Sequence, residues 1–242
     1  MRKIIVSIFL VLTFLCSLAM SETAEDWFYK AYSLLNRGKD TDQKMVIKYL
    51  NNAIKLQPDF AKAYGDRGNA YRKLGQYQRA IEDYNEAIRL QPDLAEAYYN
   101  RGITYNDLGQ YQRAIEDYNE AIRLKPDDAM AYSNRGFAYN DLGQYQRAIE
   151  DYNEAIRLKP DLTETHYNRG IGYYNLGRYQ RAIEDYNEAI RLKPDLTMAY
   201  IGRGLAYFMQ GDNRLGCRDV QKACKLGNCK ILESAEGRKY CR

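Results

Sequence analysis

The sequence predicts an all-α protein, an α-solenoid in which antiparallel helix pairs stack one after another. The first observation is a segment, QYQRAIEDYNEAIRL, that recurs at residues 76–90, 110–124, 144–158 and, with its first residue changed, 178–192. The second is the spacing, which is 34 residues each time. A fixed period of this size is typical of solenoids, whose units bury their apolar faces against their neighbours. The third is that apolar residues inside each period follow a helical spacing.

The first expected element is a secretory signal peptide at residues 1–19. Basic residues precede an uncharged, mostly apolar stretch, Ile4–Leu15, and small residues follow it. This order predicts export, with cleavage after Ala19 or Ser21, and a periplasmic or secreted protein. The alternative is a membrane anchor formed by residues 4–20, because this stretch is close to the shortest that spans a bilayer.

Composition and charge narrow the classes of function. Charged residues make up 28% of the chain and are mixed in sign, and the formal net charge is +4. This balance gives no indication of nucleic acid as a partner, and membrane proximity is expected only if the leader stays uncleaved. A single histidine leaves little basis for acid–base or metal chemistry, so we expect no catalytic residue, metal or cofactor.

The repeated unit, taken as residues 61–94, begins with a helix. Tyr64, Gly68 and Tyr71 are spaced so that they share one face of it. Gly75 is expected to end this helix, because glycine is suited to the left-handed conformation that releases the chain from a helix.

The second helix of the unit packs back on the first. Its apolar stripe consists of Tyr77, Ala80, Ile81, Tyr84, Ala87 and Ile88. Gly68 and Ala80 are expected where the two helices approach closely, since a larger side chain would overpack that contact by roughly 1–3 kcal/mol. Pro92 prevents continuation, and Asp93 with Glu96 is expected to form a capping box for the next helix.

These residues resemble the pattern of the tetratricopeptide repeat (TPR) family. The pattern reads here as Tyr64-x2-Arg67-Gly68-x2-Tyr71, then Ala80-x3-Tyr84-x2-Ala87 and Pro92. The resemblance implies a right-handed superhelix of about six units. One departure is regular, because arginine stands where the family usually has leucine, at Arg67, Arg101, Arg135, Arg169 and Arg203. We expect these arginines to pack their stems on neighbouring helices and to keep their charged heads in water.

Six units and a cap follow the leader. Their expected limits are 24–60, 61–94, 95–128, 129–162, 163–196 and 197–230, with a cap at 231–242. The first unit is three residues longer than the others, and we place the extra residues in its inter-helix turn, around 39–44. The last unit is degenerate, as terminal repeats usually are.

The resemblance also implies that the first helices of successive units line a concave groove. Asparagine recurs there once per unit, at Asn100, Asn134 and Asn168, and an amide offers both a donor and an acceptor to a peptide backbone. Side chains beside this ladder are expected to anchor a partner, namely Tyr99, Ile103, Phe137, Tyr167, Ile171 and Tyr174. The competing interpretation is that duplicated units simply duplicate a solvated asparagine.

The last unit carries an additional apolar patch, Met198, Ile201, Leu205, Phe208 and Met209. An uncovered patch of this kind marks a binding site. We expect it to be covered in part by the C-terminal segment or by a second protomer.

Four cysteines remain once Cys16 leaves with the leader. They are Cys217, Cys224, Cys229 and Cys241, an even set near the end of an exported chain, which predicts two disulfides. Antiparallel geometry favours nested bridges, Cys224–Cys229 and Cys217–Cys241, and the other pairings stay open. Zinc is the competing interpretation, but no Cys-x2-Cys pair is present.

We therefore expect a non-enzymatic scaffold that binds a peptide or protein segment in its groove. The alternative is a structural or assembly component that forms homo-oligomers through the apolar last unit. The lone His166 stands at a packing position of the repeat, which argues against a hydrolase. The recurring carboxylate pair, Glu82 with Asp83 in the first copy, is interpreted as a solvated convex face.

Overall fold

The computed structural model describes residues 22–36, 42–234 and 240–241, and within these ranges all regular elements are helices, α2 to α14. The expected leader, the anchor 4–20 and residues 39–41 of the extended turn lie outside the described residues. Two compact units divide the chain at Pro92 and Asp93, and each is described by itself. Among the described helices, none combines the length and the apolar composition needed to cross a bilayer.

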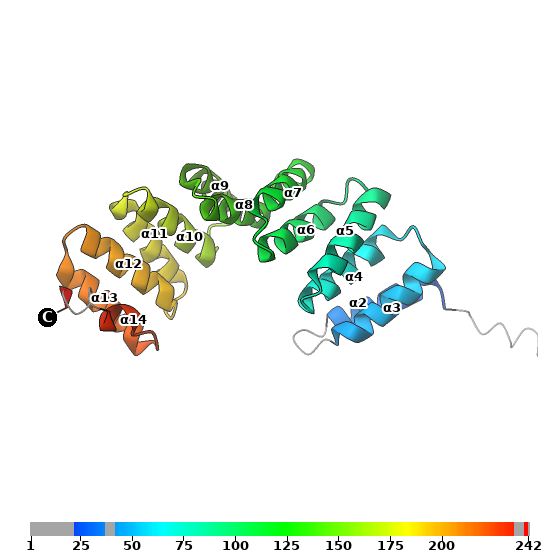
Figure 1. Ribbon diagram of the computed structural model, residues 1–242, viewed down its shortest axis with the longest axis horizontal. Coiled ribbons are helices and arrows are strands. Elements are labelled where there is room, and N and C mark those ends of the chain that lie inside the picture. Colours follow the sequence, from blue (N-terminus) through cyan, green and yellow to red (C-terminus); the bar gives the residue numbers. More distant parts are fainter. Residues whose placement is uncertain (1–21, 37–41, 235–239, 242) are drawn as a thin grey trace, which may run out of the picture. The chain divides into compact units, whose positions relative to one another are not determined.

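The first compact unit holds two helix pairs (Figure 1). Its helices are α2 (Ala24–Leu35), α3 (Gln43–Leu56), α4 (Ala61–Lys73) and α5 (Tyr77–Leu90). Each helix packs against the next one along the chain. Phe28, Val46 and Leu50 form the centre of its core, with small residues such as Ala63 on the neighbouring helix.

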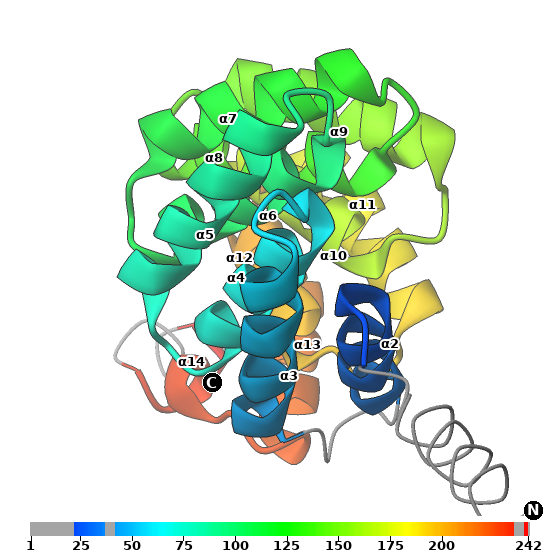
Figure 2. The ribbon, with the colours of Figure 1, turned by 90° about the vertical axis from the view of Figure 1, so that its right-hand side faces the viewer.

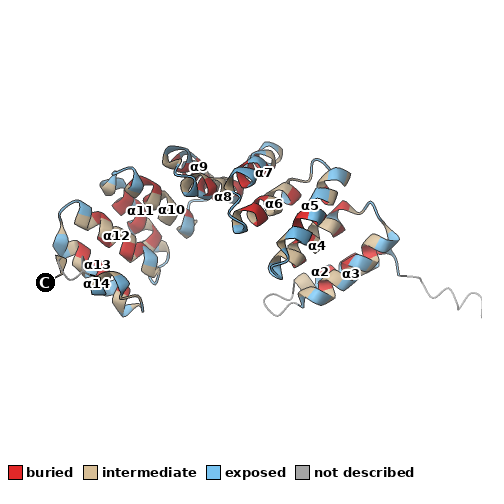
Figure 3. Cartoon of the chain, viewed as in Figure 1, coloured by how far each residue is buried: buried red, intermediate tan, exposed pale blue. Residues whose placement is uncertain are grey.

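The second compact unit continues the same arrangement. Its helices are α6 (Ala95–Asp107), α7 (Tyr111–Leu124), α8 (Ala129–Asp141), α9 (Tyr145–Leu158), α10 (Thr163–Asn175), α11 (Tyr179–Leu192), α12 (Thr197–Met209), α13 (Asn213–Lys225) and α14 (Lys230–Glu233). Successive helices of this unit pack side by side, as Figures 1 and 2 both show. Figure 3 shows buried residues where the helices face each other and exposed residues on their outer sides. The predicted α-solenoid of helix pairs is confirmed.

The turn inside each helix pair is set by a glycine. Gly75 has φ of 71°, and its amide donates to the Arg72 carbonyl while the amide of Gln76 reaches back to Tyr71. This pair of bonds is a Schellman motif, which satisfies the last carbonyls of the helix. Gly109, Gly143 and Gly177 repeat the positive φ. The predicted glycine ending is confirmed.

The predicted start of the next helix is wrong. α6 begins at Ala95 with Leu94 as its N-cap residue, and no side chain caps it. Asp93 lies one residue too early, in the turn that follows Pro92, so that its carboxylate cannot take the N-cap position. α8 is the exception, because Asp128 occupies the N-cap position and accepts hydrogen bonds from two backbone amides.

The close approach of paired helices is visible at Gly68. A Cβ atom there would lie 2.7 Å from Cε1 of Tyr84, whose ring is fully buried. Ala80, on the facing helix, is also fully buried. Small residues therefore set the distance between the helices, and the tyrosine fills the space beside them.

The recurring arginines do not keep their heads in water, which corrects the sequence-based expectation. The guanidinium of Arg135 forms two hydrogen bonds to the carboxylate of Asp151, at 2.8 and 2.6 Å, and a third at 2.7 Å to the Asn119 side chain. Asp151 is only 6% exposed. Arg135 on α8 thus bonds both to α9, the second helix of its own pair, and to α7, the second helix of the preceding pair.

The same bidentate pair recurs in every complete helix pair after the first. The pairs are Arg67–Asp83, Arg101–Asp117, Arg135–Asp151, Arg169–Asp185 and Arg203–Asp219. Asp83 is therefore a buried ion-pair partner, and only its neighbour Glu82 lies on the solvated face. The interpretation of this carboxylate pair as wholly solvated is wrong for the aspartate.

Two disulfides close the described C-terminal end. Cys217 is bonded to Cys241, and Cys224 to Cys229, which is the nested pairing that the sequence favoured. The sulfurs that a zinc ion would need are bonded to each other. The ring of Tyr240 stacks on Phe208 at 4.9 Å between centroids, so that the end of the chain covers part of the predicted apolar patch.

Candidate functional site

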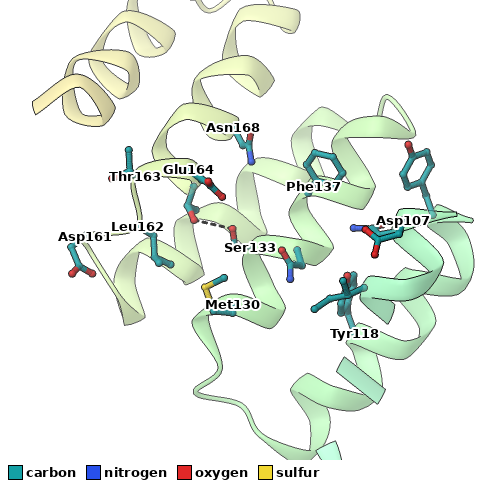
Figure 4. Close-up of a pocket in the computed structure, with 15 residues that line it drawn as sticks. Asp107, Tyr118, Met130, Ser133, Phe137, Asp161, Leu162, Thr163, Glu164 and Asn168 are labelled. Carbon is teal, nitrogen blue, oxygen red and sulfur yellow. Dashed lines mark hydrogen bonds between the residues drawn. The ribbon is translucent and has the colours of Figure 1, made fainter. Parts of the chain in front are cut away.

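A pocket of about 620 Å³ opens in the second compact unit, beside α6, α8 and α10 (Figure 4). It is built mainly from the first helices of three successive repeats. The second helix of the first of these repeats, α7, closes one side with Tyr111 and Tyr118. A pocket of this volume is within the range of binding sites for small molecules and side chains.

The apolar part of the pocket comes from four side chains. These are Ile103 on α6, Met130 and Phe137 on α8, and Leu162 before α10. Phe137 is 37% exposed and Met130 is 43% exposed. Covering large apolar side chains of this kind by a partner is favourable at roughly 25 cal/mol per Å² of apolar area.

The uncharged polar part of the pocket consists of side-chain amides and hydroxyls. The side-chain amide of Asn134 donates a hydrogen bond of 3.1 Å to the Tyr99 hydroxyl. The buried Oδ1 of Asn106 has no hydrogen-bond partner among the described residues. The hydroxyls of Ser133 and Thr165 lie 2.8 Å apart and join α8 to α10 at the pocket wall.

All charged side chains on the pocket lining are acidic. Asp107, Asp161 and Glu164 line the pocket, and its lining includes no lysine, arginine or histidine. Asp161 and Glu164 are exposed to solvent at the α10 side. A hydrogen bond to the carboxylate of Asp141 raises the pKa of Tyr111, which keeps that hydroxyl neutral. The pocket therefore presents a negative edge around an apolar floor.

Four of the nine predicted groove residues meet in this pocket, namely Ile103, Asn134, Phe137 and Asn168. They come from three different helices, as the groove prediction requires. The sequence did not single out Met130 or Leu162. Met130 lies one helical turn before Asn134, so the helical spacing points to it, whereas Leu162 precedes α10 and has no such signal.

The other predicted groove residues lie elsewhere. Tyr167, Ile171 and Tyr174 pack against the core cluster around Tyr186, and burial raises the pKa of Tyr167. Tyr99 does not line the pocket, but its hydroxyl accepts a hydrogen bond from Asn134 and its ring lies 6.1 Å from that of Tyr118, and both of these residues line the pocket. Asn100 does not line the pocket, so the asparagines do not form one continuous ladder there.

His166 belongs to the packing of the fourth full repeat. Its Nε2 lies 2.9 Å from the Pro160 carbonyl and its Nδ1 lies 3.7 Å from the Asp185 carboxylate. Burial lowers the pKa of His166, but the Asp185 carboxylate and the Pro160 carbonyl outweigh it and raise the pKa above 6.5. Among the described residues, no group of three or more metal-ligating side chains gathers anywhere.

The fold and the pocket define a class of protein, a repeat solenoid that presents a lined pocket on its first helices. The family described as "TPR repeat" matches residues 68–108, 104–143, 137–177 and 172–211, and "Tetratricopeptide repeat" matches residues 49–82. The chain belongs to the tetratricopeptide repeat family. A comparison with curated protein sequences finds no match.

Several solved structures have a similar fold. A crystal structure of MamA is 30% identical over 68% of this chain and 96% of that chain, with a TM-score of 0.63. A tetratricopeptide repeat protein from Parabacteroides merdae is 22% identical over 91% of this chain and 90% of that chain, with a TM-score of 0.73. YrrB, described as a TPR protein with an unusual peptide-binding site, is 21% identical over 78% of this chain and 97% of that chain, with a TM-score of 0.68.

Proposed function

We propose that this protein is a non-enzymatic interaction scaffold that holds an extended segment of a partner protein in the pocket beside α6, α8 and α10. The observation that carries the proposal is the convergence of Ile103, Asn134, Phe137 and Asn168 from three successive repeats. Proteins of this family bind protein or peptide partners. The likeness to YrrB supports the fold alone, and the proposal therefore depends on the pocket.

The chemistry of the pocket suits a peptide that carries an apolar side chain. Phe137 and Met130 offer exposed apolar surface for such an anchor. Asn134 and Asn168 line the pocket, and their side-chain amides would exchange hydrogen bonds with a peptide backbone. The segment would be held by its backbone and recognised by one side chain.

The negative edge adds a preference for charge. Asp161 and Glu164 lie beside the apolar floor without a cation on the pocket lining. A lysine or arginine next to the apolar anchor would therefore be attracted to this edge. We propose a partner segment in which an apolar residue is flanked by basic residues.

The test uses a fluorescein-labelled peptide with a central leucine flanked by lysines, whose binding is followed by fluorescence anisotropy. The double variant Asn134→Ala/Asn168→Ala should bind it roughly tenfold to a hundredfold more weakly, because each lost hydrogen bond contributes about 1 kcal/mol. Asn100→Ala is the matched control, since it removes the same amide at the repeat position outside the pocket. Equal affinity of the wild type, the double variant and the control would show that these amides do not bind the peptide.

Self-association through the last unit is the alternative. Ile201 is buried and Phe208 is covered by Tyr240, whereas Met198 and Met209 are 47% and 54% exposed. The remaining apolar surface is thus smaller than the sequence suggested. Sedimentation over a range of protein concentrations separates the two functions, because a monomer at all concentrations would count against assembly.

We also propose that the protein is exported and that its leader is removed. The leader pattern at residues 1–19 and the two disulfides support this proposal, because disulfides persist in oxidising compartments. The test is the N-terminal sequence of the protein recovered from the envelope or the medium of expressing cells. A protein that keeps Met1 and stays in the cytoplasm would contradict export.

A further inference from the structure

The last long helix, α13, reverses the charge that the repeats carry on the same face. In each of the four near-identical segments the second helix has two glutamates one turn apart, at Glu82 and Glu86 in the first copy. The matching positions of α13 are Arg218 and Lys222. Asp219, which lies between them, still forms the buried ion pair with its arginine. The packing residue of the repeat is therefore kept while its exposed face changes sign.

The same contrast appears in two depressions of the surface, one repeat apart. The earlier one is lined by His166, Arg169, Tyr173, Arg181, Glu184, Asp185 and Glu188. The later one, here called the basic depression, has a volume of about 380 Å³ and includes Tyr200, Arg203, Arg218, Lys222 and Lys225 in its lining. Arg218 and Lys222 occupy the places of Glu184 and Glu188.

Arg203 is paired with Asp219, which also lines the basic depression, but its three other cations have no carboxylate partner among the described residues. In the repeats the second glutamate pairs with an arginine three residues later, as Glu188 does with Arg191 at 2.5 Å. In α13 the corresponding residues are Lys222 and Lys225, which have the same charge. Among the described residues, no carboxylate pairs with Arg218, Lys222 or Lys225 within 4.0 Å. Lys222 instead lies over the ring of Tyr200, at 6.0 Å from its centroid.

Helix stability alone does not account for this arrangement. Cations in the last turn of a helix interact favourably with its dipole, and Lys222 and Lys225 gain from that effect. Arg218 stands in the middle of α13, however, where the dipole has little effect. The repeats already have an arginine in their last turn and still carry both glutamates.

We propose that the basic depression and the exposed face of α13 form a docking surface for an acidic segment of a partner protein. Arg218, Lys222 and Lys225 follow each other at intervals of four and three residues, so they form a row along one side of the helix. A row of cations at one-turn spacing matches carboxylates that are spaced along an extended chain.

A row is a poor match for a single small anion. Convergence on one phosphate would need donors from a facing helix, and the facing cation, Arg203, is already bonded to Asp219 and Asn187. Ile190 and Tyr200 also line the depression and are half-buried, so that a flat membrane surface would not reach them. An acidic protein segment with an occasional apolar residue satisfies both features.

This surface is separate from the pocket of the proposed function. The two share no lining residue, and they carry opposite charges. The protein would then hold a basic, apolar segment at one place and an acidic segment at another.

The experiment measures anisotropy of a fluorescein-labelled peptide of alternating glutamate and serine with the purified full-length protein. The variant Arg218→Glu/Lys222→Glu gives α13 the residues that the repeats have at these positions, so the substitutions suit the fold. We expect this variant to bind the peptide roughly tenfold more weakly, and added salt to weaken binding by the wild type. Arg218→Gln/Lys222→Gln serves as a milder variant if the reversal disturbs folding.

The matched control is Lys44→Glu/Lys48→Glu on α3, which makes the same change in net charge at two exposed lysines of the same spacing. It should bind the peptide as the wild type does, and so should Asn134→Ala/Asn168→Ala. The proposal is overturned if the wild type does not bind the peptide, or if the control loses as much affinity as the α13 variant. It is also overturned if inorganic phosphate, or vesicles of phosphatidylcholine and phosphatidylglycerol, bind in place of the peptide.

Discussion

Two glycines on α4 should respond to alanine in opposite directions, and this contrast tests how closely the paired helices approach. At Gly68 an added Cβ would lie 2.7 Å from Cε1 and 3.0 Å from Cδ1 of Tyr84. The Tyr84 ring is fully buried, and its hydroxyl donates a hydrogen bond of 2.8 Å to Asn69, so it has little freedom to move. At Gly65, one turn earlier, no atom lies within 4 Å of the added Cβ.

The magnitude follows from two opposing effects. Replacing glycine by alanine inside a helix stabilises it by about 1 kcal/mol, because the unfolded chain loses conformational freedom. At Gly65 nothing opposes this gain, so Gly65→Ala should stabilise the protein by about 1 kcal/mol. At Gly68 overpacking costs roughly 1–3 kcal/mol, so Gly68→Ala should destabilise the protein by up to about 2 kcal/mol.

The measurement is urea unfolding followed by circular dichroism, with the midpoints of the two variants compared at an unchanged slope. Because a repeat array can open locally, hydrogen exchange of the α4 amides gives a second, local measure. A Gly68→Ala protein as stable as Gly65→Ala would refute the reasoning, since it would show that the Tyr84 ring yields at no cost.

Three further changes test other parts of the fold by urea unfolding or hydrogen exchange. The pKa of His166 is raised above 6.5 in the folded state, so its stabilisation is complete below that value and is lost as the pH rises through the folded pKa. The urea midpoint of the wild type should therefore fall as the pH rises above 6.5, and the urea midpoint of His166→Tyr should not. Arg135→Met should cost about 2–3 kcal/mol because it leaves a buried aspartate unpaired, whereas Arg123→Met at an exposed pair should cost less than about 0.5 kcal/mol. Replacing both Cys217 and Cys241 by serine should lower the free energy of unfolding by about 3 kcal/mol and should speed hydrogen exchange of the α13 amides. Unchanged exchange of these amides would contradict this.

The helices, their order and their glycine endings were predictable from the sequence because one short segment repeats at a fixed interval. Each copy of the repeat shows the same apolar spacing, so that one well-defined unit determines the others. The N-caps were not predicted correctly. A Pro-Asp pair has the composition of a helix start, but Asp93 and Leu94 both follow Pro92 before α6 begins at Ala95, so Asp93 is one residue too early for the N-cap position.

The ion pairs were missed because their two members are 16 residues apart and lie on different helices. Arg135 and Asp151 each look like a surface residue when its own helix is read alone. A signal was nevertheless present. An arginine and an aspartate recur in register in every unit after the first, and in the four near-identical units they stand next to the glycine and the tyrosine of the close contact. Residues that repeat beside a packing contact are themselves candidates for burial.

The pocket was predicted only in part, and the reason is geometric. The repeat pattern assigns a helix face to each position, and Asn134, Phe137 and Asn168, which it put on the same face of successive repeats, line the pocket. It does not show how far each side chain is covered by the next unit. Ile171 and Tyr167 have the same register as residues of the pocket, but the packing of the later repeats covers them.

The last unit departs from the repeat pattern at two positions of the apolar stripe, and both hold cysteines that form disulfides. Cys217 and Cys224 stand where the fourth full repeat has Ile183 and Ile190, which are residues of the apolar stripe. In the described part of the chain only the short helix α14 follows α13, so that no further repeat covers this stripe there. Disulfides from these two positions tie the end of the chain to α13, and Tyr240 covers Phe208. The inner face of α13 is thus closed by covalent bonds, whereas its outer face, which is exposed in the repeats as well, takes no part in packing and carries cations in place of glutamates.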